Sequence, residues 1–246
     1  INKYSDVLLK TSDFIAELDL IRSCAIVSKE NAYVKPNITR NNTKSSNSDN
    51  TSYINATGIR HPLVEKINTS VEYIKNDVVL GTSDGIDGMM LYGVNASGKS
   101  NLMKAIGVNI VLAQAGCYVA CDKFDYVPFK YLFTRILNND NIYAGMSSFQ
   151  VEMTEFKTIL KYANQNSIVL GDELCHGTET NDAASIVAAG VNILSKRKTK
   201  FIFATHLHIL ASDEHIMSLD NVCLKHMTVK FDENNKKFIY ERKLKD

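Results

Sequence analysis

The stretch that most constrains the fold is GMMLYGVNASGKSN, residues 88–101, because a short apolar run ends abruptly in a glycine-containing loop. GMMLYG predicts a buried strand, and residues 99–115 that follow predict a helix. Two similar apolar runs, SIVLGDE at 167–173 and KFIFATH at 200–206, flank a helical segment at 180–198. Strands that alternate with helices predict an α/β fold with a mainly parallel sheet, whose functional groups gather at the C-terminal ends of the strands.

The two ends of the chain have different patterns. Residues 5–31 carry apolar side chains at spacings of three and four, which predicts an amphipathic helix. Residues 37–57 are rich in Asn, Ser and Thr and predict a loop. Residues 223–244 alternate around DENNKK, which indicates an antiparallel hairpin at the edge of the sheet. We therefore expect a helical segment at 1–35, a linker or loop at 36–57 and an α/β domain at 58–246.

Composition narrows the functional class. The formal net charge of +1 predicts no strong general attraction to nucleic acid or to acidic membranes. No apolar run is long enough to cross a membrane, so we expect an intracellular protein with no membrane partner. The five scattered cysteines predict reduced thiols, and Cys117 and Cys121 fall in an expected helix, where buried apolar roles are favoured over a metal site. The chain begins on Ile, and we expect it to be part of a longer protein.

The segment GVNASGKS, residues 93–100, fits the pattern G-x-x-x-x-G-K-[ST] between a strand and a helix. Glycines let several backbone N–H groups point at phosphate oxygens, and the helix N-terminus adds its positive end. In this pattern Lys99 reaches the β and γ phosphates and the Ser100 hydroxyl binds Mg²⁺. The alternative is a chance match. We expect the nucleotide to contact Gly93, Val94, Asn95, Ala96, Ser97, Gly98, Lys99, Ser100 and Asn101.

Two further strand ends supply groups for hydrolysis. Asp172 and Glu173 follow an apolar strand; Asp172 is expected to hold Mg²⁺, and Glu173 to orient and polarise a water for attack on the γ phosphate. Alone, such a pair is more often a solvated turn. His206 follows the next strand, where it could sense the γ phosphate. His206 and His208 could also suggest zinc, but no further ligands stand at useful spacing.

The combination of GIRHPLVE, GVNASGKS, SSFQVEMTE, IVLGDELCHGTETND and FATHLHIL resembles the ATPase domain of the MutS mismatch-repair family, a branch of the ABC-type P-loop ATPases. The resemblance covers roughly residues 57–246, and the helical residues before the Asn-rich segment resemble the end of the family's lever region. It implies an Mg²⁺-dependent ATPase that hydrolyses ATP to ADP and phosphate. Double-stranded DNA would be bound by other parts of the full-length protein.

The resemblance also implies a dimer, either a homodimer or a heterodimer with a MutS-like partner, with each ATP held between two subunits. Ser147 and Ser148 would then serve the partner's nucleotide, with Ser147 nearest its γ phosphate. The alternative is that SSFQVEMTE, residues 147–155, is an N-capped helix, and both interpretations can hold together. By the same resemblance Tyr73 and Ile74 would pack on the adenine, with Asn76 as their polar neighbour.

The sequence departs from the family pattern at VNAS inside the loop and at His176, where arginine is usual, which suggests a divergent viral or mitochondrial branch. Two alternatives stay open. One is a MutS-like protein that binds recombination intermediates or DNA structures without reading mismatches. The other is a different ABC-type chromosome ATPase, although those carry an LSGGQ-like signature. No N-K-x-D motif supports a GTPase.

Overall fold

The computed structural model describes residues 4–39, 51–67, 72–136, 148–175, 178–232 and 236–246. In chain order the elements are α1 (Ser5–Glu30), β1 (Asn37–Ile38), β2 (Tyr53–Ile59), α2 (Val64–Ile67), β3 (Asn76–Leu80), β4 (Gly88–Tyr92), α3 (Lys99–Gln114), β5 (Lys123–Val127), β6 (Tyr131–Arg135), α4 (Ser148–Tyr162), β7 (Ser167–Asp172), α5 (Thr180–Lys196), β8 (Lys200–Thr205), the 3₁₀ helix η3 (His208–Ser212), α6 (Glu214–Met217), β9 (Val222–Asp232) and β10 (Lys237–Lys245).

The larger of the two sheets formed by the described strands has the order β10-β9-β4-β8-β7-β6. Neighbours from β9 to β6 run parallel, and β10 pairs antiparallel with β9 at the edge. The predictions of a mainly parallel sheet and of a C-terminal hairpin are therefore confirmed. Because the strands are parallel, the ends of β4, β7 and β8 meet at one edge, which positions the candidate site.

The second sheet has the order β1-β5-β2-β3, with β2 antiparallel to both of its neighbours and β1 parallel to β5. Strand β1 and the first five residues of β2 fall in residues 36–57, so the prediction of a linker or loop there is wrong at 37–38 and 53–57. These residues form strands because β2 buries Ile54 and Ala56 on alternate positions against the core.

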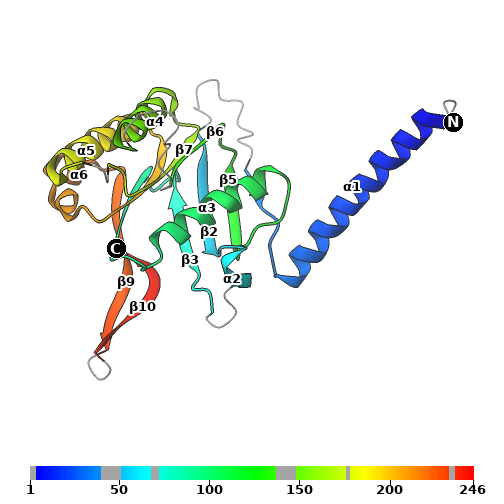
Figure 1. Cartoon of the computed structure of the whole chain (residues 1–246), viewed down its shortest axis with the longest axis horizontal. Helices are drawn as coiled ribbons and strands as arrows, with labels where there is room; N and C mark the ends of the chain where they lie inside the picture. The colour runs from blue at the N-terminus through cyan, green and yellow to red at the C-terminus, as the bar shows by residue number, and fades with distance from the viewer. Residues whose placement is uncertain (1–3, 40–50, 68–71, 137–147, 176–177, 233–235) are drawn as a thin grey trace.

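Helix α3 lies between the two sheets, and α4, α5 and α6 cover the opposite face of the larger sheet (Figure 1). Alternation along β4 builds both cores: Met89 and Leu91 face the α3 side, whereas Met90 and Tyr92 face the α5 side. Leu102 of α3 is buried among residues from both sheets. The helix is thus held on two faces, which fixes the position of its first turn.

The end of α3 corrects the expectation for two cysteines. The helix stops at Gln114, and Gly116 adopts a left-handed φ of +82°. The amide of Gly116 donates to the carbonyl of Ala113, and the amide of Cys117 donates to the carbonyl of Leu112. These two hydrogen bonds are those of a Schellman motif at a helix C-terminus. Cys117 and Cys121 therefore lie in the connection to β5, not on a helix.

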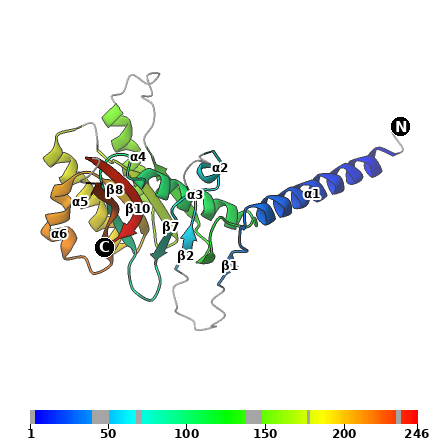
Figure 2. The ribbon, with the colours of Figure 1, turned by 90° about the horizontal axis from the view of Figure 1, so that it is seen from below.

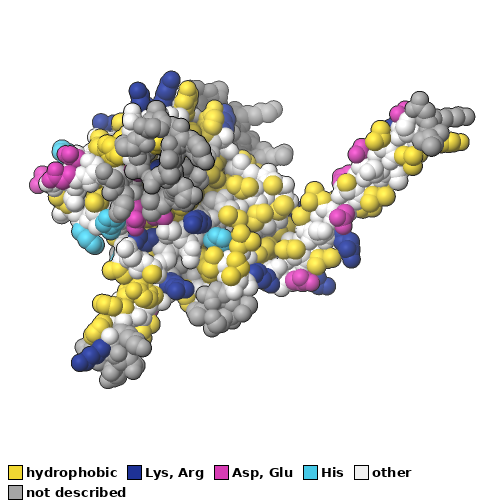
Figure 3. All heavy atoms as spheres, viewed as in Figure 1, with side chains coloured by type: hydrophobic (Ala, Val, Ile, Leu, Met, Phe, Trp, Pro, Cys, Tyr) yellow, Lys and Arg dark blue, Asp and Glu magenta, His cyan; other side chains and the backbone are white. Residues whose placement is uncertain are grey.

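Helix α1 projects from the rest of the chain, as two perpendicular views show (Figures 1 and 2). None of its residues is buried, and Val7, Leu9, Phe14 and Ile21 are exposed. Apolar side chains are visible along its length in Figure 3. The predicted helix is confirmed, but it is not amphipathic, because its apolar side chains do not gather on one face, and the described residues provide no core for them. No helix among them is both long and apolar enough to cross a membrane.

Candidate functional site

The loop 93–98 connects the end of β4 to the start of α3, as the sequence predicts. Gly98 has a φ of +104°, a conformation that side chains rarely adopt, and a Cβ on Gly93 would lie 2.8 Å from the Ser97 hydroxyl. Ala96 has a φ of +63°, which costs an L residue about 1 to 2 kcal/mol. The loop is therefore compact, and its backbone is held in a strained conformation of the kind that is found at functional sites.

The loop concentrates hydrogen-bond donors. The first N–H groups of α3 have no partner within the helix, and no side chain of the described residues caps this end. The Lys99 ammonium, 5% exposed as a residue, donates to the carbonyls of Gly93 at 2.6 Å and Val94 at 3.2 Å. Burial lowers the pKa of Lys99, and the carboxylates of Glu173 and Asp172 raise it. A buried cation beside free helix donors is a suitable environment for an anion.

Asp172, at the end of β7, is buried next to the start of α3. It is 4% exposed, and its Oδ1 has no partner among the described atoms. The Ser100 side chain lies beside this carboxylate. Burial raises the pKa of Asp172, the Ser100 hydrogen bond lowers it, and Glu173 raises it. Two adjacent oxygen ligands with one unused lone-pair site fit Mg²⁺, which usually takes few protein ligands and completes its shell with phosphate and water.

Glu173 and His206 face one another across neighbouring strand ends. The Glu173 Oε1 lies 3.8 Å from the His206 Nδ1, and the two side chains are 20% and 43% exposed. Glu173 also has a left-handed φ of +50°, which is a strained conformation. Its backbone amide donates to the carbonyl of Ala204, and this hydrogen bond holds the conformation in place. A cavity of about 340 Å³ is lined by Glu173 and residues 95–101. The structure thus brings Glu173, Lys99 and Ser100 to one space.

A second hollow, of about 30 Å³, lies on the other side of Gly98 and is lined by Tyr73, Ile74 and Asn76. Burial and the nearby Glu65 raise the pKa of Tyr73 to about 12. The Asn76 side chain is occupied by the chain itself, because its amide donates to the Arg242 carbonyl and its oxygen accepts from the Leu244 amide. The three residues predicted to contact a base therefore meet beside the loop, with Asn76 also fastening β10.

Two expected residues are less fully described. Ser147 lies outside the described residues, as does His176. Ser148 is the first residue of α4, in agreement with the predicted helix start. The role of these serines towards a partner subunit stays a prediction.

Three residues that sequence reasoning did not select also shape the site. Met227 of β9 and Arg242 of β10 line the hollow with Tyr73, although they are more than a hundred residues away in sequence. Glu152 of α4 is buried and accepts from the amide of Cys175 at 2.8 Å, which fixes the turn after the two carboxylates. The sequence signal that could have identified Glu152 is the VEM segment within α4. Met227 and Arg242 had none, since only the fold brings the hairpin there.

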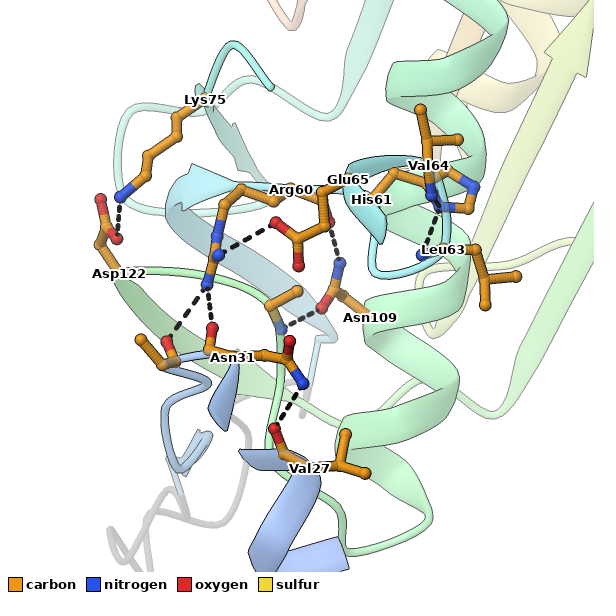
Figure 4. Close-up of polar contacts among 12 residues, drawn as sticks. Val27, Asn31, Arg60, His61, Leu63, Val64, Glu65, Lys75, Asn109 and Asp122 are labelled. Carbon is orange, nitrogen blue, oxygen red and sulfur yellow. Dashed lines mark hydrogen bonds and ion pairs between the residues drawn. The ribbon is translucent and has the colours of Figure 1, made fainter. Parts of the chain in front are cut away.

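Arg60 connects this region to the end of α1, as Figure 4 shows. Its guanidinium pairs with Glu65 at 3.0 Å and donates to the carbonyls of Asn31 at 3.2 Å and Ala32 at 3.1 Å. It also lies 5.7 Å from the centre of the Tyr33 ring. Glu65 lines the second hollow as well, so one ion pair stands between that hollow and the carbonyls that follow α1.

These features define a mixed α/β domain with a mainly parallel sheet, in which a lysine-bearing glycine loop and two carboxylates gather at the C-terminal ends of the strands. The family description MutS domain V matches residues 89–246, which include all of these groups except the residues of the second hollow that precede β4. The chain belongs to the MutS family.

Relatives extend the similarity over almost the whole chain. A mitochondrial DNA mismatch repair protein mutS homolog of Sarcophyton glaucum is 43% identical over 243 residues, 98% of this chain and 23% of that protein. A putative DNA mismatch repair protein mutS homolog of Acanthamoeba polyphaga mimivirus is 34% identical over 276 residues, 99% of this chain and 24% of that protein. DNA mismatch repair protein MutS of Lactobacillus gasseri is 35% identical over 245 residues, 99% of this chain and 27% of that protein. The chain spans about a quarter of the length of these relatives.

Proposed function

We propose that this chain is the ATP-binding and ATP-hydrolysing domain of a mismatch repair protein, of the ABC-type P-loop class, and that it requires Mg²⁺. The observation that carries the proposal is the buried Asp172 carboxylate, which lies beside Ser100 of the first turn of α3 and has one oxygen without a partner among the described atoms. Lys99, the first residue of α3, and Glu173, which follows β7, line one cavity with Ser100. A buried carboxylate with an open oxygen is costly unless a ligand completes it.

In this proposal the N–H groups of the 93–98 loop and Lys99 bind the phosphates. Ser100 and Asp172 hold Mg²⁺, which when bound neutralises charge on the phosphate oxygens. Glu173 orients the attacking water and accepts its proton, while His206, 3.8 Å away, holds the Glu173 carboxylate in position and contacts the outer phosphate. Tyr73 and Ile74 pack against the base beside Gly98.

The proposal extends to a dimer that closes on ATP and switches a clamp on double-stranded DNA. It rests on the mismatch repair function that the relatives' names give and on Ser148 as the first residue of α4, with Ser147 directly before it in the sequence. A helix N-terminus offered to the partner's nucleotide would make closure depend on ATP. Hydrolysis would remove the shared contact and release the clamp.

The test compares Glu173→Gln with Glu214→Gln, a matched change of an exposed carboxylate in the first turn of α6. Glu173→Gln should keep ATP affinity within a few-fold and lower phosphate release by about two to four orders of magnitude. Glu214→Gln should leave both unchanged. Radioactive or fluorescent nucleotide titration gives binding, and phosphate release gives turnover. Failure of the unaltered chain to bind Mg²⁺ATP would refute the proposal, and unchanged turnover in Glu173→Gln would refute that residue's role.

The dimer has its own test. In the hydrolysis-deficient Glu173→Gln background, ATP should increase the sedimentation coefficient to that of a dimer. The further change Ser147→Arg should leave nucleotide binding intact and abolish this increase, because a long cation would enter the contact with the partner. A Ser147→Arg chain that dimerises normally would contradict the role in trans.

A further inference from the structure

Two thiols from distant parts of the sequence meet where α1 joins the rest of the chain. Cys24 lies in α1, and Cys117 follows the helix end at Gly116. Both line one cavity of about 600 Å³ between α1 and the loop that follows α3. Both are partly exposed, so a small oxidant or reductant can reach them. The nucleotide site does not use this cavity.

The two side chains are close enough to influence each other. The pKa of the Cys117 thiol is raised, first by burial and then by its hydrogen bond to the neighbouring Cys24 thiol. The remaining cysteines do not compete for this contact, since Cys121 and Cys175 are buried and Cys223 lies in β9. Of the five cysteines, Cys24 and Cys117 line this cavity together.

The backbone around the pair is already fixed on both sides. Val34, just after α1, and Val119, just after Cys117, exchange two backbone hydrogen bonds of 2.9 Å each. Cys117 itself donates its amide to the helix end. A disulfide needs its two Cα atoms within about 7 Å, so a bond between these thiols requires α1 to lie against the loop that follows α3, as their shared cavity places it.

We propose that Cys24 and Cys117 form a reversible disulfide that fastens α1 to the end of α3. The thiols lose two protons and two electrons and the sulfur–sulfur bond forms. The electrons pass either to hydrogen peroxide, which becomes two waters, or to glutathione disulfide, which becomes two glutathione molecules. A dithiol reductant reverses the reaction by exchange. A partly exposed disulfide of this kind is of the labile, regulatory type rather than a structural staple.

The bond would act on the helix that also carries the candidate site. Helix α3 begins at Lys99 and ends beside Cys117, and its buried faces pack against both sheets. Oxidation would therefore fix the last turns of α1 at one end of a rigid element whose other end is the 93–98 loop. The disulfide itself does not depend on the nucleotide proposal and can be tested without nucleotide.

The test oxidises the whole chain with glutathione disulfide, alkylates the remaining thiols and digests with chymotrypsin, which cuts after Tyr118 and separates Cys117 from Cys121. Mass spectrometry should find Cys24 linked to Cys117 and the other three cysteines alkylated, with dithiothreitol reversing the link. Cys24→Ser and Cys117→Ser should each abolish it, whereas the matched Cys223→Ser should not.

A digestion with a second protease tests the same link independently. Trypsin cuts α1 after Lys29, and in the oxidised chain the fragment that carries Cys24 should stay attached until it is reduced. Linkage should be at least ten-fold higher in the native chain than in the same chain oxidised in urea. A native yield no greater than that in urea, or separate glutathione adducts on Cys24 and Cys117, would overturn the proposal.

Discussion

The buried charge of Asp172 should lower the stability of the free chain and favour the binding of Mg²⁺. The substitution Asp172→Asn tests both effects. In the free protein the ionised carboxylate is out of contact with water, and its Oδ1 has no partner among the described atoms. Asparagine keeps the shape and an oxygen for the Ser100 hydroxyl but removes the charge. We therefore expect Asp172→Asn to stabilise the free chain and to weaken its response to Mg²⁺ATP.

The magnitude follows from the unpaired atom. A buried polar group without a partner costs about 1 to 3 kcal/mol, and an ionised one more, while the new amide leaves part of this cost in place. The net gain should be about 1 to 2 kcal/mol. For a chain of this size 1 kcal/mol shifts Tm by about 2 to 4 °C, so Tm should rise by roughly 2 to 8 °C at pH 7. Addition of Mg²⁺ATP at about 100 times Kd should stabilise the unaltered chain by about 2.7 kcal/mol and the variant far less.

The pH dependence follows from the pKa of Asp172, which burial raises above its ordinary value of 3.8. A raised pKa means that the folded state binds the proton more readily than the unfolded state, so the ionised carboxylate lowers stability above the raised pKa. That loss disappears as the pH falls below 3.8. The advantage of the asparagine should thus be full at neutral pH and shrink in acid.

Thermal unfolding measured from pH 4 to pH 8, with and without Mg²⁺ATP, checks both parts. Asp84→Asn is the matched control, since Asp84 is exposed on the turn that precedes β4, at the opposite end of that strand from the loop. It should change Tm by less than about 2 °C. A lower Tm for Asp172→Asn at pH 7 would refute the reasoning about the unpaired charge. An undiminished response to Mg²⁺ATP would refute the metal role.

Two ion pairs should contribute very differently to stability. Lys200 is fully buried and pairs with Asp87 at 3.3 Å, so Lys200→Met should lower the free energy of unfolding by about 3 kcal/mol in urea titration. Lys196→Met, at the exposed last residue of α5, should change it by less than about 0.5 kcal/mol, and equal effects would contradict this. Arg60→Met should speed amide exchange just after α1 at least ten-fold, since three hydrogen bonds are lost, and Lys75→Met, which breaks an exposed pair, should not.

The centre of the larger sheet was predictable because β4, β7 and β8 are buried along their whole length and read as continuous apolar runs. The smaller sheet was not. Strand β2, YINATGI, mixes polar and apolar residues and buries alternate ones against partners that lie distant in sequence. The Asn-rich residues that precede β2 in the sequence also have the composition of a loop. The alternation has meaning only once β3 and β5 are known to flank it.

The same distinction applies to the candidate site. Groups carried by one strand end or one loop, such as Asp172 or Lys99, were found from short contiguous motifs. Arg242 was missed because the register of the hairpin, with its irregularity between Tyr240 and Leu244, decides what it faces. The end of α3 at Gln114 agrees within one residue with the predicted helix at 99–115, whereas the placement of Cys117 and Cys121 on a helix was wrong although Gly116 signals a helix end.

Helix α3 explains why the loop and the α1 junction belong to one mechanical unit. Leu102, Ile106 and Ile110 are buried between the two sheets, and such close-packed contacts resist bending. A shift that phosphate binding causes at Lys99 would therefore move the helix as a body instead of being absorbed along it. The movement would reach the loop at Cys117, where backbone bonds to Val34 transmit it to the segment that follows α1. A disulfide at this point would resist that movement at the end of α3 opposite the nucleotide.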